Sequence, residues 1–219
     1  MLSIATRQQT PPIFLFTSSG AVYGDMPNKM KAFSEDCRLA ANSFAVKSAY
    51  AEGKRAAKFL LAEANSRGLC RARLARLFAF SGPLLPLNRH FAIGNFIRDA
   101  INNQKIIVRG DGTPIRFYLD ETDMASWLIA SIHRGRPDSI YHIGSEHGIT
   151  ISDLAHLVSS RYAQMKDVPC TVEVTGQSSA LDGISRYVPE TFATRMELGT
   201  QETVSLEESI DKMFRAHLQ

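Results

Sequence analysis

A serine, a tyrosine and a lysine are spaced so that together they could move a proton from an alcohol. Ser19 follows the apolar run 13–16, which predicts a parallel strand buried on both faces. Tyr50 and Lys54 are four residues apart, so a helix would place the phenol and the ammonium on one face. A hydroxyl beside such a pair suits removal of a sugar or alcohol proton while a hydride leaves the same carbon.

The elements that must position these residues indicate an α/β fold in which strands and helices alternate. The pattern predicts strands at 13–18, 72–80, 106–108, 115–119, 139–143 and 171–174. It predicts helices at 48–66, 93–102, 123–133, 152–162, 190–198 and 206–218, and a loop over 24–47. Ser152 is the predicted N-cap of its helix.

Three of these strands, 13–18, 72–80 and 139–143, should be parallel neighbours in one sheet, with helix 48–66 packed on a face. Ligands of open α/β sheets bind at the carboxyl ends of the strands, which is where Ser18 and Ser19 would lie. We therefore expect Ser19, Tyr50 and Lys54 to converge at that edge. The alternative is that Tyr50 and Lys54 are an ordinary exposed tyrosine and a solvated lysine.

Composition favours a globular, cytoplasmic protein. The 219 residues are 44% hydrophobic and 21% charged, which is ample for a core. A net charge of +3 without a basic tract argues against a nucleic-acid partner. Three distant cysteines and histidines without ligand spacing argue against disulfides and metal sites. The chain has no 18-residue apolar stretch, and its first residues are too polar for a signal peptide, so no membrane contact is expected.

An ordered set of short motifs from residue 14 to the C-terminus resembles one known family. The motifs are Thr17-Ser18-Ser19 with Val22-Tyr23-Gly24, Tyr50-x-x-x-Lys54, Arg76-Leu77-Phe78 with Gly82-Pro83, Asn95-Phe96-Ile97, Gly110-Asp111-Gly112 with Arg116, Asp123-Met124-Ala125, Tyr141-x-Ile143-Gly144-Ser145, and Met196-Glu197-Leu198-Gly199. In their order and spacing they are similar to the extended short-chain dehydrogenase/reductases, in the group of NAD-dependent nucleotide-sugar epimerases and dehydratases.

The resemblance implies the C-terminal portion of a Rossmann-like, doubly wound parallel sheet with a smaller α/β substrate-binding lobe. Residues 1–82 would be a partial NAD-binding domain that carries the catalytic residues. Residues 83–219 would form mainly the lobe that binds the nucleotide sugar, with 115–145 returning to the sheet. The implied cofactor is NAD or NADP, and the implied substrate is a nucleoside-diphosphate sugar.

The same resemblance implies the roles of the reactive residues. Tyr50 would take the proton from the C4 hydroxyl of the sugar as the hydride passes to NAD. Lys54 would favour the phenolate form of Tyr50 and bind the nicotinamide ribose. Ser19 would hydrogen-bond both the substrate and the carbonyl that develops at C4. Ser18 and Phe78 would join Tyr50 and Lys54 on the cofactor side.

Substrate binding is implied for Asn95, Phe96, Gly110 and Arg116. Asn95 and Phe96 would reach the nucleotide base or ribose. Gly110 and Arg116 resemble a diphosphate-binding turn and its arginine, whose planar fork suits a phosphate. The alternative is that 110–112 is only a hairpin turn with a surface arginine nearby.

The two residues after Ser19 bear on the reaction outcome. In the 4,6-dehydratases of the family, these positions resemble an acid pair, Asp then Glu. Here Gly20 and Ala21 can neither donate nor accept a proton. The sequence thus favours an epimerase- or reductase-type outcome, and a dTDP-glucose 4,6-dehydratase-like reaction is the alternative. A further alternative is a truncated, non-catalytic remnant that binds a nucleotide sugar or completes the fold of a partner.

The glycine-rich turn that opens the family's Rossmann domain is absent from this sequence, because residues 1–12 contain no glycine. We expect a truncated gene, a misassigned start or a separate N-terminal chain. The 219-residue polypeptide should then bind NAD weakly and be inactive alone. A helix reduced to residues 1–9 should also compromise the family's homodimer and expose apolar surface around Phe59 and Leu60.

Overall fold

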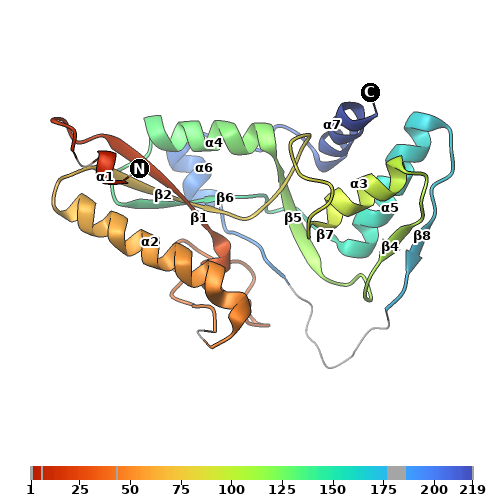
Figure 1. Ribbon diagram of the computed structural model, residues 1–219, viewed down its shortest axis with the longest axis horizontal. Coiled ribbons are helices and arrows are strands. Elements are labelled where there is room, and N and C mark those ends of the chain that lie inside the picture. The colour runs from red at the N-terminus through yellow and green to blue at the C-terminus, as the bar shows by residue number, and fades with distance from the viewer. Residues whose placement is uncertain (1, 6, 43, 177–185, 219) are drawn as a thin grey trace. The chain divides into compact units, whose positions relative to one another are not determined.

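The computed structural model describes residues 2–5, 7–42, 44–176 and 186–218 (Figure 1). These residues form two compact units. The first contains residues from 1–78, 124–146 and 188–201, and the second contains residues from 79–123, 147–187 and 202–219. Strands and helices alternate in both, which confirms the predicted α/β class.

A three-stranded parallel sheet is the centre of the first unit. Its order is β1 (Ile13–Ser19), β2 (Arg71–Leu77) and β6 (Ser139–Ile143), so the predicted neighbourhood of these strands is confirmed. The prediction that β1 is buried on both faces is wrong for the described chain. Ile13 is 38% exposed, and β2 is the only described partner of β1, which makes β1 an edge strand.

Helix α2 (Ala49–Ser66) covers one face of this sheet, as predicted (Figure 1). Phe14 and Phe16 of β1 pack against a small core that includes Leu61 and Ala64 of α2. The helix begins with Ala49 after the short 3₁₀ turn η2 (Val46–Ser48). A second such turn, η1 (Gly20–Tyr23), follows β1. A single-turn helix, α1 (Leu2–Ala5), comes before β1 in the chain.

Helices α4 (Glu121–His133) and α6 (Phe192–Leu198) lie on the other side of the sheet from α2 (Figure 1). Trp127 of α4 is fully buried and donates a hydrogen bond to the Gln201 carbonyl (3.2 Å). Helix α4 begins at Glu121 rather than at the predicted Asp123. Its first turn belongs to the second unit and the rest belongs to the first.

The second unit combines two small sheets with three helices. Strands β3 (Ala79–Ser81), β5 (Ile115–Asp120) and β7 (Gly148–Thr150) form one sheet in that order, and β4 (Ile106–Val108) pairs with β8 (Val172–Val174) in the other. Helices α3 (Ala92–Ile101), α5 (Ile151–Lys166) and α7 (Leu206–His217) share one apolar core. Its buried members include Ile93, Ile97, Leu154, Val158, Ile210, Met213 and Phe214.

Two predicted elements differ from the structure near the boundary of the units. The predicted strand 72–80 is two strands, because β2 ends at Leu77 and β3 pairs with β5 of the second unit. The Phe78 N–H between them donates to the Ile143 carbonyl (3.1 Å). Strand β5 therefore lies in the second unit, whereas the sequence interpretation returned residues 115–145 to the first sheet.

The predicted N-cap Ser152 is wrong. The hydroxyl of Thr150 accepts a hydrogen bond from the Asp153 N–H (3.0 Å) and caps α5, which begins at Ile151. The reason is the unpredicted strand β7, which runs directly into the helix. Ser152 is thereby inside the first turn, where its N–H donates to the Gly112 carbonyl (3.0 Å).

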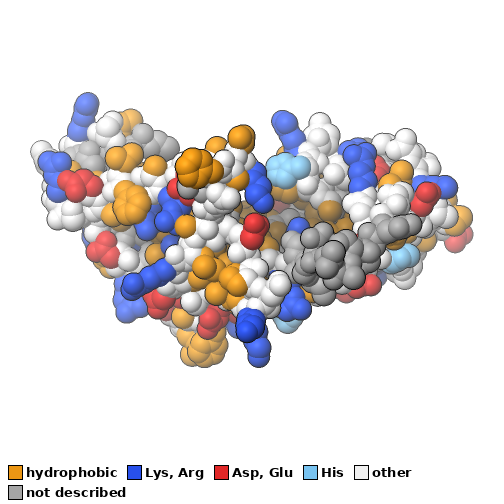
Figure 2. All heavy atoms as spheres, turned by 90° about the horizontal axis from the view of Figure 1, so that it is seen from below, with side chains coloured by type: hydrophobic (Ala, Val, Ile, Leu, Met, Phe, Trp, Pro, Cys, Tyr) orange, Lys and Arg blue, Asp and Glu red, His pale blue; other side chains and the backbone are white. Residues whose placement is uncertain are grey.

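The remaining expectations concern membrane-spanning helices, metal ligands, cysteines, surface charge and the exposed apolar residues of α2. Within the described ranges, no helix is long and apolar enough to cross a membrane, and no group of three or more His, Cys, Asp or Glu could hold a metal ion. All three cysteines are free. Positive and negative side chains are interspersed over the face drawn in Figure 2. On α2, Phe59 and Leu60 are 62% and 66% exposed.

Candidate functional site

The Lys54 ammonium reaches the carboxyl end of β1. Its Nζ donates to the Thr17 carbonyl at 2.8 Å and lies 5.3 Å from the centre of the Phe16 ring. Tyr50, one turn earlier on α2, has its ring centre 5.6 Å from the same Nζ and is 59% exposed. The predicted pair is therefore held beside the strand that ends with Ser19.

Ser19 is the last residue of β1 and caps the turn that follows it. Its Oγ accepts a hydrogen bond from the Ala21 N–H at 3.1 Å. Because a serine hydroxyl also carries a hydrogen, it keeps the capacity to donate to a substrate oxygen. The two proposed cofactor-side residues, Ser18 and Phe78, are both buried, and the Phe78 ring contacts that of His142 (5.2 Å between centres).

Gly53 lies between Tyr50 and Lys54 on the exposed part of α2. A Cβ added there would meet no protein atom within 4 Å, so no other described segment of this protein approaches Gly53 closely. Because glycine costs roughly 1 kcal/mol inside a helix, its presence beside the reactive pair leaves room for a ligand rather than for packing.

A buried group of side chains, the Tyr23 cluster (Tyr23, Arg76 and His142), lies on the α2 face of the sheet. Arg76 donates to the Tyr23 hydroxyl and to the Glu35 carbonyl (3.0 Å). The Tyr23 oxygen is 2.6 Å from His142 Nε2 and 2.9 Å from the Ser34 carbonyl. The cluster holds the η1 turn, which follows Ser19, against β2 and β6.

The electrostatics of the cluster fix its protonation. Burial, with a further contribution from Arg76, lowers the pKa of His142 to about 3, so the imidazole is neutral. Its Nδ1 lies 3.0 Å from the Glu190 carbonyl and therefore carries the hydrogen, which leaves Nε2 as an acceptor. The single hydrogen of the Tyr23 hydroxyl is shared between this Nε2 and the Ser34 carbonyl. Burial raises the pKa of Tyr23 to about 12 although Arg76 opposes the shift, so the phenol stays protonated.

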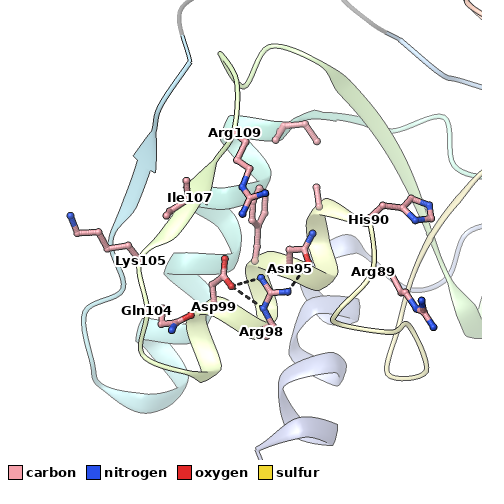
Figure 3. Close-up of a pocket in the computed structure, with 12 residues that line it drawn as sticks. Arg89, His90, Asn95, Arg98, Asp99, Gln104, Lys105, Ile107 and Arg109 are labelled. Atoms are coloured by element: carbon pink, nitrogen blue, oxygen red, sulfur yellow. Dashed lines mark hydrogen bonds and ion pairs between the residues drawn. The ribbon is translucent and has the colours of Figure 1, made fainter. Parts of the chain in front are cut away.

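A groove of about 750 Å³ lies between α3 and β4 in the second unit (Figure 3). We call it the α3–β4 groove. Its apolar lining includes Phe96, Ile107 and Ile151, and its polar lining includes three arginines, a lysine and one carboxylate. The full lining is Arg89, His90, Ala92, Asn95, Phe96, Arg98, Asp99, Gln104, Lys105, Ile107, Arg109 and Ile151. A volume of this size suits a small-molecule ligand.

The polar side chains at the centre of the groove are organised around Arg98. Its guanidinium donates twice to one Asp99 oxygen (3.0 and 2.7 Å) and once to the Asn95 side-chain oxygen (2.9 Å). Figure 3 shows Arg109, from the end of β4, extending over the groove toward the same residues. The structure thus brings the predicted Asn95 and Phe96 together with three charged residues that the sequence analysis did not select.

The other two predicted substrate residues, Gly110 and Arg116, are not among the lining residues. One guanidinium nitrogen of Arg116 donates to the Ile115 carbonyl (2.9 Å). A sequence signal for the missed residues existed. Helical spacing aligns Asn95 with Asp99, and alternation along β4 aligns Ile107 with Arg109.

Comparison with known proteins decides the family. Residues 1–144 match the model of the NAD dependent epimerase/dehydratase family. The chain belongs to that family.

Curated relatives agree with this assignment. The chain is 26% identical over 216 residues to UDP-glucuronic acid decarboxylase 1 of Arabidopsis thaliana, covering 97% of this chain and 46% of the relative. It is 26% identical over 212 residues to UDP-glucuronic acid decarboxylase 1 of Danio rerio, covering 97% and 48%. The chain thus spans about half the length of these curated relatives.

Solved structures share the fold. A UDP-glucose 4-epimerase from Thermotoga maritima, determined with UDP-glucose, aligns with a TM-score of 0.81 at 18% identity, over 98% of this chain and 66% of that one. A UDP-glucuronic acid 4-epimerase from Bacillus cereus, in complex with NAD, gives 0.78 at 18% identity over 98% and 62%. The Rossmann-like α/β fold implied by the sequence motifs is therefore confirmed.

Proposed function

We propose that this chain carries the acid–base residues and the nucleotide-sugar site of an NAD(P)-dependent enzyme that oxidises a nucleoside-diphosphate sugar at C4. The observation that carries the proposal is the hydrogen bond from Lys54 Nζ to the Thr17 carbonyl (2.8 Å). It fastens the helix with Tyr50 and Lys54 to the end of the strand with Ser19. The family assignment and the groove with cationic lining support the same function.

The residues of the first unit fit the nicotinamide end of the dinucleotide. Lys54 uses one N–H for the Thr17 carbonyl and keeps two for ribose hydroxyls. Tyr50 is 59% exposed, and its ring centre lies 5.6 Å from Lys54 Nζ. When bound, the dinucleotide supplies a hydride acceptor. The adenine half would need residues outside this set.

The chain's own residues then perform the proton chemistry. Tyr50 takes the proton from the C4 hydroxyl as the C4 hydrogen leaves as a hydride. Ser19 donates a hydrogen bond to the oxygen that becomes the C4 carbonyl. Gly20 and Ala21 offer no acid or base for dehydration, which favours return of the hydride at C4 in an epimerase- or reductase-type outcome.

A second candidate outcome is decarboxylation, which the resemblance to UDP-glucuronic acid decarboxylases favours. Oxidation of a uronic acid at C4 makes a ketone that is β to the carboxylate. The carboxylate carbon then leaves as CO₂, and its bonding electrons pass to the ketone as an enolate. This step needs no acid–base pair at positions 20 and 21, so Gly20 and Ala21 are compatible with it.

Saturation-transfer NMR tests the cofactor contacts, because it detects millimolar binding to the 219-residue polypeptide. We expect the nicotinamide and its ribose to receive more saturation than the adenine, and Lys54→Met to reduce that transfer. Lys47→Met is the matched control, since Lys47 only forms an exposed pair with Asp25. Equal transfer across the whole dinucleotide, unchanged by Lys54→Met, would contradict the proposed contacts.

A fusion tests the chemistry. The amino-terminal part of a related UDP-glucuronic acid decarboxylase that this chain does not match is placed before Met1. We expect turnover of UDP-sugars by the fusion and its loss in Tyr50→Phe. A pentose product with CO₂ from UDP-glucuronic acid would select the second candidate, and a C4-epimer would select the first. Undiminished turnover by Tyr50→Phe would overturn the catalytic assignment.

A further inference from the structure

We propose that Arg55, Lys58 and Arg76 form a binding site for a small inorganic anion between α2 and the carboxyl end of β2. We call these three residues the α2 cation site. Arg55 and Lys58 come from α2, and Arg76 comes from β2. The proposal goes beyond the proposed function, because it rests on a local excess of positive charge and not on the sugar chemistry.

The packing of α2 on the sheet brings these side chains together. Leu61 of α2 and Ala72 near the start of β2 belong to one small core. Alternation along β2 places Arg76 on the same face as Ala72, nearer the carboxyl end of the strand. Lys58 comes one turn before Leu61 on α2. Burial lowers the pKa of the Lys58 ammonium, and the charges of Arg76 and Arg55 lower it further, which agrees with this placement.

Arg76 is the buried end of the α2 cation site and is only 7% exposed. Its Nη1 donates to two uncharged acceptors, the Tyr23 hydroxyl and the Glu35 carbonyl. Its Nε is buried and has no hydrogen-bond partner among the described residues. A buried donor on a charged group is costly to leave unpaired. The Arg76 guanidinium therefore offers both a free N–H and an unbalanced charge to an anion.

Lys58 and Arg55 form the outer part of the site. Lys58 makes no hydrogen bond or ion pair with a described residue, and its Nζ lies 4.7 Å from the centre of the Phe59 ring. Arg55 donates to the Val22 carbonyl at 3.3 Å, and its Nε lies 3.7 Å from the Glu52 carboxylate. In the described chain, Glu52 is thus the one carboxylate paired with these three cations.

The chemistry of the donors indicates what the site would hold. The flexible Lys58 ammonium carries three N–H donors, and the Arg76 Nε–H lies behind it in the interior. An anion between them would accept charge-assisted hydrogen bonds from both and offset the excess charge. Because the Nε is closed to solvent, the occupant has to be an ion of few atoms, such as chloride or inorganic phosphate.

Chloride NMR line broadening tests the site on the 219-residue polypeptide. We expect the wild type to broaden the chloride signal and Lys58→Glu to lose this excess line width, because its carboxylate would occupy the place of the ion. Lys31→Glu is the matched control, since it makes the same change of charge at an exposed lysine of the first unit. It should keep the excess line width.

Urea unfolding followed by Trp127 fluorescence measures the same occupancy as stability. Sodium gluconate replaces sodium chloride at constant ionic strength, so that the screening of exposed charges is unchanged. About a tenfold excess of chloride over its dissociation constant should raise the wild-type midpoint by about 0.5–1.4 M. In gluconate, Lys58→Glu should have a higher midpoint than the wild type, and chloride should not raise it further.

The contrary results are equally specific. Equal wild-type midpoints in chloride and gluconate, or excess line width that survives in Lys58→Glu, would overturn the proposal. If far-UV circular dichroism shows that Lys58→Glu is unfolded, Lys58→Met carries the test, because it removes one cation without adding an acid and should also lose the excess line width. Displacement of the bound chloride by inorganic phosphate would support the site and make an oxyanion its preferred occupant.

Discussion

Replacement of Tyr23 by phenylalanine should destabilise the first unit by about 3 kcal/mol. The change removes a hydroxyl that accepts from the Arg76 guanidinium, a type of bond worth about 1.5–3 kcal/mol. It also removes the hydrogen that Tyr23 shares between the buried His142 Nε2 (2.6 Å) and the Ser34 carbonyl (2.9 Å), and the unpaired acceptors cost about 1–3 kcal/mol. The ring stays stacked on Phe33 (4.6 Å between centres), so no cavity opens.

Urea unfolding followed by tryptophan fluorescence measures this effect. Trp127 is the only tryptophan of the sequence and is buried in the first unit, so its fluorescence reports on that unit. With a urea dependence of about 1–3 kcal/mol per M, a loss of 3 kcal/mol lowers the midpoint by about 1–3 M. Tyr50→Phe is the control, because Tyr50 is exposed and should change stability by less than about 0.5 kcal/mol.

A Tyr23→Phe midpoint that coincides with that of Tyr50→Phe would refute the reasoning. It would mean that the Arg76 and His142 contacts contribute no net stability. An intermediate shift that persists in a His142→Gln background would instead assign the effect to Arg76 alone. The double variant therefore separates the two contacts.

Three further predictions concern the buried His142, the Lys212–Asp120 ion pair and the affinity for NAD. Urea midpoints of the first unit should fall as the pH drops from about 6.5 toward 3. Burial lowers the pKa of His142 to about 3, so on acidification the unfolded chain protonates this imidazole before the folded chain does. A His142→Gln variant whose midpoint fell equally steeply with pH would contradict this. Lys212→Met should lower the free energy of unfolding by about 3–5 kcal/mol, because it leaves the fully buried Asp120 carboxylate without its cation. Lys105→Met breaks an exposed pair and should lower it by less than about 1 kcal/mol. Thermal unfolding followed by circular dichroism measures both changes. Calorimetry should find no better than millimolar NAD affinity for the 219-residue polypeptide. A pyrophosphate contact and a ribose contact, worth about 1.5–3 kcal/mol each, come in this fold from a glycine-rich turn and the strand after it, which are not among these 219 residues. Micromolar affinity would refute this prediction.

The sequence predicted those parts of the fold and site that depend on local pattern. The apolar run before Ser18 predicted β1, and the alanine-rich stretch around Tyr50 predicted α2 to within one residue. Helical spacing alone predicted that Tyr50 and Lys54 would be neighbours, and the hydrogen bond of Lys54 to Thr17 at the end of β1 follows from parallel sheet architecture.

The parts that could not be predicted depend on contacts between distant residues. Tyr23 and His142 are 119 positions apart, and no local pattern indicates that their side chains form a hydrogen bond. The same applies to the division of strand 72–80, which is decided by the pairing of Ala79 with Tyr118. The motif that ends with Arg116 led the sequence analysis to select this residue and not Arg109, whereas in the structure Arg109 lines the α3–β4 groove and Arg116 does not.

The separation of these residues between the two units makes the proposals independently testable. Lys54 and Tyr50 belong to the first unit, and the α3–β4 groove belongs to the second. Lys54→Met should therefore lower saturation transfer to nicotinamide without changing the affinity for a nucleoside diphosphate. If Lys54→Met weakened both ligands equally, one structural disturbance would explain the data better than two sites, and circular dichroism together with Trp127 fluorescence would detect that disturbance.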